Sequence, residues 1–416
     1  MSDPNVYDPN AAYWAETVAY NDLGLLTSEA QTLFARTERT VTYGYDQFGY
    51  RTSIGYPDGT TTITRTNTWD GRIDGLSRGG TALAGYDYLG QRVAWRAYNT
   101  ATPVVAAYSY DMLGRVTDID ADSSRVDLHY SYVLLEHNIA GIRFDHRPGT
   151  PYNSYGYDDL DRVTQVTYLN NDTEAFPMDD LGNRVGQVTQ RDGVHTYSVD
   201  ELTNRYTAID ANSLAYDDAG SLTQDKDGYR TTYDYENRPV RIAKLDGQTE
   251  VTVATFAYDA LGRRIRKVDA IAGTTSLYYY SDNWQVLADY DGSGVLQASY
   301  AYGNYIDEVL LMRRGGADYF YLHDHLYSPA ALLAGTGAVV ERYEYDVYGT
   351  CHIQAPDFSS RTASLYGNAF LFQGHMQDSL DSGSLKPYDF RYRAYDSFAG
   401  RWMQQDPMQY VDGLNL

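Results

Sequence analysis

The chain has 416 residues, with 33 Lys and Arg against 56 Asp and Glu, and a formal charge of −23 at neutral pH. This excess of negative charge excludes a surface that binds nucleic acid by neutralising phosphates. A single cysteine, Cys351, excludes an intrachain disulfide framework and a multi-cysteine metal site. The 43 tyrosines, against 11 Phe and 5 Trp, favour β-sheet, because a Tyr ring packs on a pleated surface while its hydroxyl stays in water.

Residues 1–42 differ most from the rest of the chain. Met1 to Asn10 lack the basic and apolar regions of a signal peptide, and no apolar run of about 18 residues indicates a membrane-spanning helix. Ser28 is followed three residues later by Gln31, which is the pattern of a helix N-cap. We therefore expect a short helix or a plug in this segment.

Residues 43–320 contain a repeat of the form Tyr-Asp-x-x-Gly. One more complete copy, at Tyr345, follows this segment. Incomplete copies occur between the complete ones, for example at Trp69, Tyr157 and Tyr233. The aspartates follow one another at intervals of 17 to 25 residues, apart from one interval of 47 that matches two units. The complete copies are Tyr45, Asp46 and Gly49; Tyr86, Asp87 and Gly90; Tyr110, Asp111 and Gly114; Tyr216, Asp217 and Gly220; Tyr258, Asp259 and Gly262; and Tyr345, Asp346 and Gly349.

The stretch YDALGRRIRKV, residues 258–268, shows the chemistry of one unit. The Tyr ends a strand, the Asp accepts hydrogen bonds from backbone N–H groups two residues on, and the Gly adopts positive φ. The residues that follow alternate by two, as in a strand. Asp161 and Asn237 stand in the Gly position of their copies, and both residue types tolerate the left-handed region. We therefore interpret the repeated carboxylates as turn residues.

A period near 20 residues that varies by several residues predicts strand-turn-strand units. The predicted fold class is all-β, an antiparallel ribbon wound into a spiral or a partial hollow shell. Tyr rings of successive units are expected to stack along one face.

Four further features are interpreted as structural. His323, Asp324 and His325 would place two imidazoles on one face of a strand, but no third metal ligand stands at a diagnostic spacing. Cys351 and His352 are adjacent and so face opposite ways in a strand. The stretch GTGAVV from Gly335 lacks the Lys and helix of a phosphate loop, and the acidic residues 118–127 lack a calcium-binding register. We expect no cofactor and no metal.

The repeats resemble the YD repeats of Rhs proteins, of the C subunits of Tc insecticidal toxins and of teneurins. The resemblance covers Tyr43 to Leu416. Residues 321–349 are similar to the segment that opens the Rhs-associated core. Residues 372–416 are similar to the core itself, with F-x-G, R-x-Y-D, G-R-W, D-P and D-G-L-N-L in the family's order.

The resemblance implies a β-ribbon shell that encloses a C-terminal toxin, and a core that cuts the toxin free by aspartyl-type self-cleavage. Asp406 and Asp412 match the core motifs and are the candidate catalytic acid pair. The resemblance also implies secretion or a cell-surface location. The implied partners are a C-terminal toxin or a separate chain that completes the shell, and a homo-oligomer promoted by salt is a further expectation.

The sequence given departs from the family at three points. It stops at Leu416, before the family's cleavage stretch. Gln405 precedes Asp406 and Gln409 stands at a usual Gly position. The array is also short, because about a dozen units can make part of a shell. Three functions therefore remain open. They are a non-catalytic shell scaffold of an Rhs-type toxin, a cell-surface adhesion module as in teneurins, and a self-cleaving core that needs residues beyond 416. The expected domains are an N-terminal segment 1–42, a spiral 43–320 and a core-like segment 321–416.

Overall fold

The protein is built from three antiparallel sheets. The computed structural model describes residues 14–34, 36–149 and 151–408. The first sheet consists of β1 (Trp14–Tyr20), β2 (Leu26–Leu33), β3 (Arg39–Tyr45), β4 (Arg51–Gly55), β5 (Thr62–Asn67), β6 (Ile73–Arg78), β7 (Thr81–Leu89), β8 (Arg92–Tyr98), β9 (Val104–Tyr110), β10 (Val116–Asp120), β11 (Asp127–Tyr132), β12 (Ile139–Phe144), β13 (Tyr152–Tyr157), β14 (Val163–Thr167), β15 (Thr173–Ala175), β16 (Gly186–Gln190), β17 (Gly193–Asp200), β18 (Arg205–Ile209) and β19 (Asn212–Ser213).

The second sheet continues directly from the first. It consists of β20 (Ala215–Tyr216), β21 (Leu222–Gln224), β22 (Arg230–Tyr233), β23 (Pro239–Asp246), β24 (Thr249–Tyr258), β25 (Arg264–Asp269), β26 (Thr274–Tyr280), β27 (Val286–Asp291), β28 (Leu296–Tyr302), β29 (Val309–Arg314), β30 (Ala317–His323), β31 (Pro329–Ala334), β32 (Val339–Tyr345), β33 (Cys351–Gln354) and β34 (Ser360–Arg361).

A small third sheet and two 3-10 turns form the C-terminal segment, residues 370–403, which we call the plug. The elements of the plug are η1 (Phe372–Gly374), β35 (Met376–Gln377), η2 (Asp381–Gly383), β36 (Tyr388–Phe390), β37 (Arg393–Asp396) and β38 (Arg401–Trp402). Within the described ranges, these two 3-10 turns are the helical elements, and no helix is long and apolar enough to cross a membrane. The all-β prediction is confirmed.

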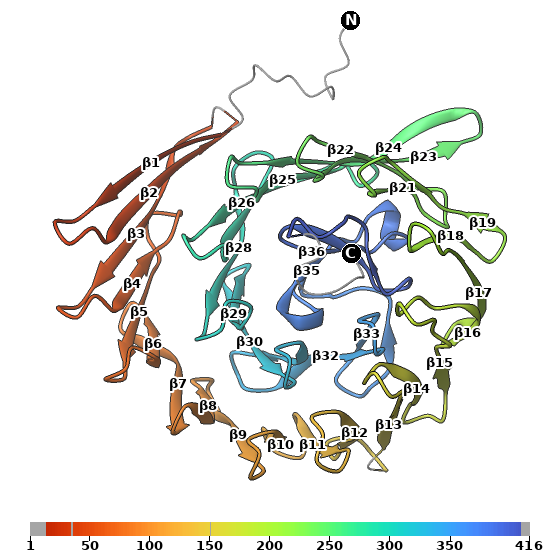
Figure 1. The fold of residues 1–416 in the computed structure, drawn as a ribbon. Coiled ribbons are helices and arrows are strands. Elements are labelled where there is room, and N and C mark those ends of the chain that lie inside the picture. The colour runs from red at the N-terminus through yellow and green to blue at the C-terminus, as the bar shows by residue number, and fades with distance from the viewer. Residues whose placement is uncertain (1–13, 35, 150, 409–416) are drawn as a thin grey trace, which may run out of the picture.

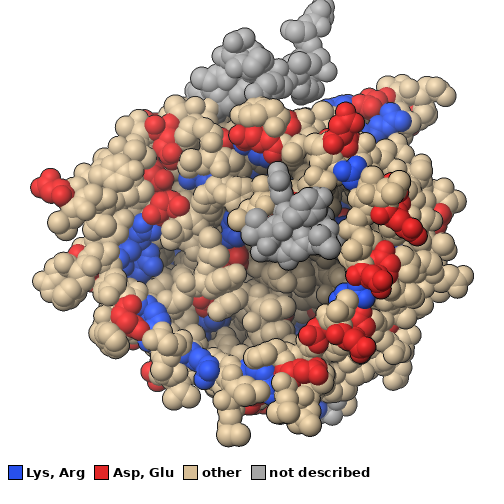
Figure 2. All heavy atoms as spheres, in the orientation of Figure 1, with Lys and Arg blue, Asp and Glu red and all other residues tan. Residues whose placement is uncertain are grey.

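The ribbon winds into a spiral and is not closed into a barrel. Within each large sheet every strand pairs with the next strand in the sequence. The first sheet forms the outer arc, the second sheet passes inside β1 to β12, and the plug occupies the centre (Figure 1). Acidic side chains are distributed around the face that this view presents (Figure 2).

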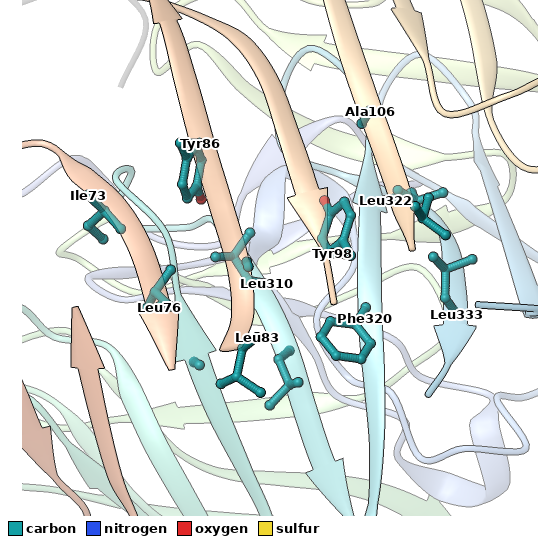
Figure 3. Packing of buried hydrophobic residues seen from close by; sticks show 14 of the residues in the cluster. Ile73, Leu76, Leu83, Tyr86, Tyr98, Ala106, Leu310, Phe320, Leu322 and Leu333 are labelled. Carbon is teal, nitrogen blue, oxygen red and sulfur yellow. The ribbon is translucent and has the colours of Figure 1, made fainter. Parts of the chain in front are cut away.

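Burial patterns follow from this winding. In β3 only one face is covered, and burial alternates so that Val41 and Tyr43 point inward. In β28 the five residues Ala298–Tyr302 are all buried, because the first sheet covers one face and the plug covers the other. The two turns of the spiral therefore share a core. In this core the rings of Tyr98 and Phe320 pack edge-to-face, with their centroids 6.1 Å apart (Figure 3).

The sequence-based expectation for residues 1–42 needs correction. Residues 1–13 lie outside the described residues, and the stretch from Ser28 forms strand β2 instead of a helix. Glu29, Gln31 and Leu33 alternate toward the interior, where Gln31 Nε2 donates to Tyr280 O at 3.3 Å. The cap-like spacing of Ser28 and Gln31 was outweighed by pairing with β1 and β3.

The boundary expected at residue 320 falls inside β30. The spiral continues past this point to β34, and the segment at its centre begins near Phe370. The segment of the described chain that fills the spiral is thus C-terminal.

Candidate functional site

The YD turns are three-residue hairpin loops closed by their aspartate. Asp46 Oδ1 accepts hydrogen bonds from the N–H groups of Phe48 and Tyr50, both at 2.9 Å. Asp111, Asp158, Asp179, Asp234 and Asp259 make the same two bonds, to the residues two and four positions on. The glycines of the six complete copies have φ between +63° and +96°. A type I turn with a bulge needs this left-handed corner, and Asp161 and Asn237 adopt it at φ +61° and +59°.

Tyr and Arg side chains link each turn to the neighbouring unit. Tyr110 Oη donates to Val93 O at 2.8 Å, one hairpin earlier, and Tyr45, Tyr258 and Tyr345 make equivalent bonds. Arg115 binds Asp111 through Nε at 2.6 Å and lies 4.3 Å from the centroid of the Tyr132 ring. The expected stack of Tyr rings is therefore an alternation of Tyr rings and guanidinium groups, which allows close packing on the ring faces.

The unit at Tyr86 departs from this geometry. Strand β7 extends to Leu89, so Asp87 lies in a strand and its Oδ1 accepts from the N–H of Tyr88. Tyr88 takes the linking role, since its hydroxyl bonds to Ile73 O and Arg72 lies 4.0 Å from its ring centroid. The repeat is displaced by two residues here because the hairpin loop is shorter. Tyr86 instead points toward the second sheet.

Tyr86 belongs to a buried polar cluster between the two turns of the spiral. Its hydroxyl donates to Glu308 at 2.8 Å, and Glu308 forms an ion pair with Arg96. Arg96 and Glu308 are both 2% exposed. Arg96 also lies 3.1 Å from His323 Nδ1. Burial and the Arg96 charge hold the pKa of His323 well below its usual value, so its ring is neutral.

The predicted features around residues 323 and 351 have structural contacts. His323 ends β30, while His325 lies in the next turn against the Tyr130 ring at 4.7 Å, and Asp324 closes that turn through Leu326 and Ser328. Across the residues that the structure describes, no group of three His, Cys, Asp or Glu side chains is arranged to hold a metal ion. Burial raises the pKa of the Cys351 thiol, and His352 Nε2 binds Asp346 at 2.8 Å.

The two candidate catalytic carboxylates cannot be assembled into one described site. Asp406 Oδ2 lies 2.9 Å from Arg393, and its Oδ1 accepts from the N–H of Met408 at 2.8 Å. Asp412 lies outside the described residues. What the structure gives for Asp406 is the geometry of a salt-bridged turn residue.

Buried ion pairs fix the plug inside the spiral. Arg264 of β25 binds Asp378 at 2.5 Å and Asp389 at 3.0 Å, and Lys267 binds Asp378 at 2.9 Å. Burial alone would raise the pKa of Asp378, but the two cations lower it below its usual range. For Asp389, burial and the neighbouring Asp378 outweigh Arg264 and raise the pKa. The two carboxylates therefore differ in proton affinity although they share one guanidinium.

A second set of plug contacts involves the loop before β29. Arg391 forms an ion pair with Asp307, and the His375 ring stacks on Phe390 at 3.8 Å. Burial and the Arg391 charge lower the pKa of His375 to about 3. Arg264, Asp378, Asp389 and Asp307 were not singled out from the sequence. The partners are 84 to 125 positions apart, so no local spacing could have indicated them.

The comparisons with known proteins agree with this architecture. A family model described as the teneurin YD-shell matches residues 149–415, from the loop before β13 to beyond the plug. The chain belongs to the teneurin YD-shell family. The matched part of this YD-shell chain includes β13 to β19 of the first sheet, all of the second sheet and the plug.

The relatives of this YD-shell chain include a nuclease and a toxin subunit. The chain is 26% identical over 263 residues to the tRNA3(Ser)-specific nuclease WapA of Bacillus spizizenii, which is 62% of this chain and 11% of that protein. It is 23% identical over 355 residues to toxin subunit YenC1 of Yersinia entomophaga, or 74% of this chain and 35% of that protein. The chain thus spans a tenth to a third of the length of these relatives.

The fold is that of a Tc toxin shell. The crystal structure of TcdB2-TccC3-Cdc42 superimposes with a TM-score of 0.77 at 16% identity, covering 96% of this chain and 23% of that chain. The crystal structure of TcdB2-TccC3 gives a TM-score of 0.76 at 17% identity over the same shares. Because the superposition covers almost the whole chain, β1 to β12 have the shell architecture as well.

Proposed function

We propose that this YD-shell chain is a non-catalytic scaffold of an Rhs-type toxin, which encloses or presents a polypeptide cargo on its C-terminal side. The plug carries this proposal. It lies at the centre of the spiral and contacts the second sheet through Tyr388 and Tyr395 and the first sheet through Ala399. A cargo on the C-terminal side would therefore follow a segment that lies inside the spiral.

Other features support the same function. The plug is held by buried ion pairs and by aromatic contacts such as Tyr300 with Phe370, which suits a part that must stay in place while a cargo is bound. A nuclease, a toxin subunit and a deaminase toxin are among the relatives, and each is longer than the matched region. The proposal includes export from the cell and, as a further partner, a separate chain that completes the shell.

Protection of a C-terminal extension tests the cargo role. A 12-residue peptide with one protease site would be added after Leu416, and the same peptide would be added before Met1 as the matched control. We expect the C-terminal copy to be cleaved at least tenfold more slowly. Equal cleavage rates at the two ends would contradict the proposal.

Intact mass over time tests the absence of catalysis. Asp406 is salt-bridged to Arg393, so we expect the purified chain and its Asp406→Asn variant to keep a constant mass. A discrete product that appears in the parent chain and is absent from Asp406→Asn would support the self-cleaving alternative instead.

A further inference from the structure

Hairpin loops line the two long sides of the first sheet, where its strands begin and end. These two sides, which we call edges, carry different side chains. Successive turns of an antiparallel meander lie on opposite edges, so all YD turns of β1 to β19 share one edge, which we call the YD edge. At the tips of its turns this edge presents large apolar side chains that are at least 64% exposed, among them Phe48, Trp69, Met112, Leu135, Leu160 and Leu202.

The opposite edge has no such row. Its turns lie at residues 34–38, 56–61, 79–80, 99–103, 121–126, 145–151, 168–172, 191–192 and 210–211. Leaving aside residues 35 and 150, which are not described, these turns contain no exposed large apolar side chain. The apolar tips are therefore a property of one edge and not of the ribbon as a whole.

The turn itself does not require an apolar tip. Asp and Gly close the loop through backbone hydrogen bonds, and the position two residues after Asp accepts most residue types. A side chain such as Leu202, at 96% exposure, gains almost nothing from burial when the chain folds. Rows of exposed apolar side chains mark interaction surfaces in soluble proteins.

In one hairpin turn of the second sheet, the side chain at the tip contacts other side chains of this chain. Tyr348 stands two residues after Asp346, in the same turn position as Phe48 and Leu160. Its ring meets Phe176 edge-on at 5.0 Å and lies 4.1 Å from the Arg184 guanidinium. The tip position thus binds an apolar and cationic neighbour within this chain.

The charges on the YD edge are predominantly acidic. Arg115 and Arg162 are paired with the turn carboxylates Asp111 and Asp158. Beside the tips, Asp159, Asp180 and Glu201 are exposed and form no ion pair with any described residue. A complementary surface needs apolar side chains and positive charge, whereas a second copy of this edge or an anionic membrane would be repelled.

We propose that the YD edge of the first sheet docks a partner protein whose surface combines apolar side chains with Lys and Arg. The apolar tips supply the buried area, and the exposed carboxylates select a basic partner. This inference rests on the separate partner chain of the proposed function. Its test does not involve the C-terminal cargo, so either proposal can fail while the other stands.

The test uses two labelled peptides of equal charge, one of alternating Leu and Lys and one of alternating Ser and Lys. The edge variant is Met112→Ser, Leu135→Ser, Leu160→Ser and Leu202→Ser, which leaves every carboxylate in place. The matched control replaces four exposed apolar residues elsewhere by Ser: Leu245, Ile271, Val295 and Leu296. Far-UV circular dichroism and thermal melts check that each variant folds.

We expect the parent chain to bind the Leu-Lys peptide at least tenfold more tightly than the Ser-Lys peptide, as measured by fluorescence anisotropy. The edge variant should lose this difference and the control variant should keep it. Equal binding of both peptides by the parent, or an edge variant that behaves as the parent does, overturns the proposal.

Two other occupants give different results. Self-association in light scattering that the edge variant abolishes would assign the edge to a second copy of this chain. Binding to phosphatidylcholine vesicles that the edge variant abolishes would assign it to a lipid surface. Either result overturns the proposal.

Discussion

Asp259 differs from the other turn aspartates in its surroundings. It is 3% exposed, and its Oδ2 lies 2.5 Å from Nε of Arg263, whose side chain is 1% exposed. Most other YD aspartates lie at the surface, where water replaces a lost partner. Asp259 therefore contributes more to the free energy of unfolding than the turn aspartates at the surface do.

We predict that Asp259→Ala lowers the free energy of unfolding by about 3–5 kcal/mol, because it leaves the Arg263 charge buried without its main partner. Asp259→Asn keeps the Oδ1 acceptor for Leu261 and Arg263 and should cost less. Urea denaturation measures both. Asp111→Ala is the control at an exposed turn, and a loss equal to that of Asp259→Ala would contradict the role of burial.

Asp225 gives a prediction on pH dependence. Burial raises its pKa to about 7, and the nearby Asp396 adds to the effect. In the unfolded chain the pKa is about 3.9. Between about pH 4 and pH 7 the folded state keeps a proton that the unfolded state has lost, so this group makes stability fall as pH rises and has no further effect above about pH 7.

Asp225→Asn removes this contribution and keeps the Oδ1 acceptor for the N–H groups of Asp227 and Tyr229. We expect the variant to gain stability relative to the parent as pH rises from 4 to 7 in urea denaturation series. A difference between the two proteins that stays constant over this range would mean that the carboxyl is ionised throughout.

At the scale of elements, the plug strands depend on the second sheet. β35 to β38 are two to four residues long, and strands this short are not stable alone. Their position comes from Asp378 and Asp389, which bind Arg264 of β25, and from the Tyr388 ring packed in the core. The plug is therefore ordered by the spiral around it.

We predict that Asp378→Ala loosens the plug, because Arg264 and Lys267 lose a shared carboxylate in a buried site, at a cost of about 3–5 kcal/mol. Hydrogen exchange of residues 370–403 should increase, while exchange in β5 to β10 stays unchanged. Glu250→Ala, which removes a surface pair with Arg241, is the control and should leave the plug protected. Unchanged exchange in Asp378→Ala would show that apolar contacts alone hold the plug.

At the scale of the whole molecule, the two turns of the spiral stabilise one another. One core cluster combines residues of β3 to β12 with residues of β27 to β31 (Figure 3). The Arg96–Glu308 pair crosses the same interface. Neither turn can keep this face buried without the other, so we expect the chain to unfold as one cooperative unit.

Leu322→Ala tests this coupling. Leu322 is 2% exposed and lies between the two turns of the spiral. Its truncation to Ala should lower the free energy of unfolding by about 2–5 kcal/mol. Far-UV circular dichroism and tyrosine fluorescence should still give coincident transitions in urea. Leu202→Ala, at an exposed tip, should change stability by less than about 0.5 kcal/mol. Two separate transitions in the parent chain would contradict the shared core.

The sequence by itself determined the ribbon. The YD turn is closed by contacts between residues two and four positions apart, as at Asp46 and Tyr50, and the repeat spacing then dictates antiparallel hairpins. These are local interactions, so their pattern is visible in the sequence. The resemblance in residues 321–416 likewise pointed to a shell family that the comparisons confirmed.

The tertiary structure alone decided how the ribbon is wound. Residues 28–37 carry a helix-like cap signal, yet β2 forms because its neighbours supply strand pairing on both sides. Tyr86 does not have the usual role of the repeat tyrosine, because β7 extends beyond it to Leu89. Its hydroxyl instead donates to Glu308, which is 222 positions away in the sequence. Contacts such as Arg264 with Asp378 and Arg96 with Glu308 join distant segments. They depend on the curvature of the whole sheet, which no short stretch of sequence encodes.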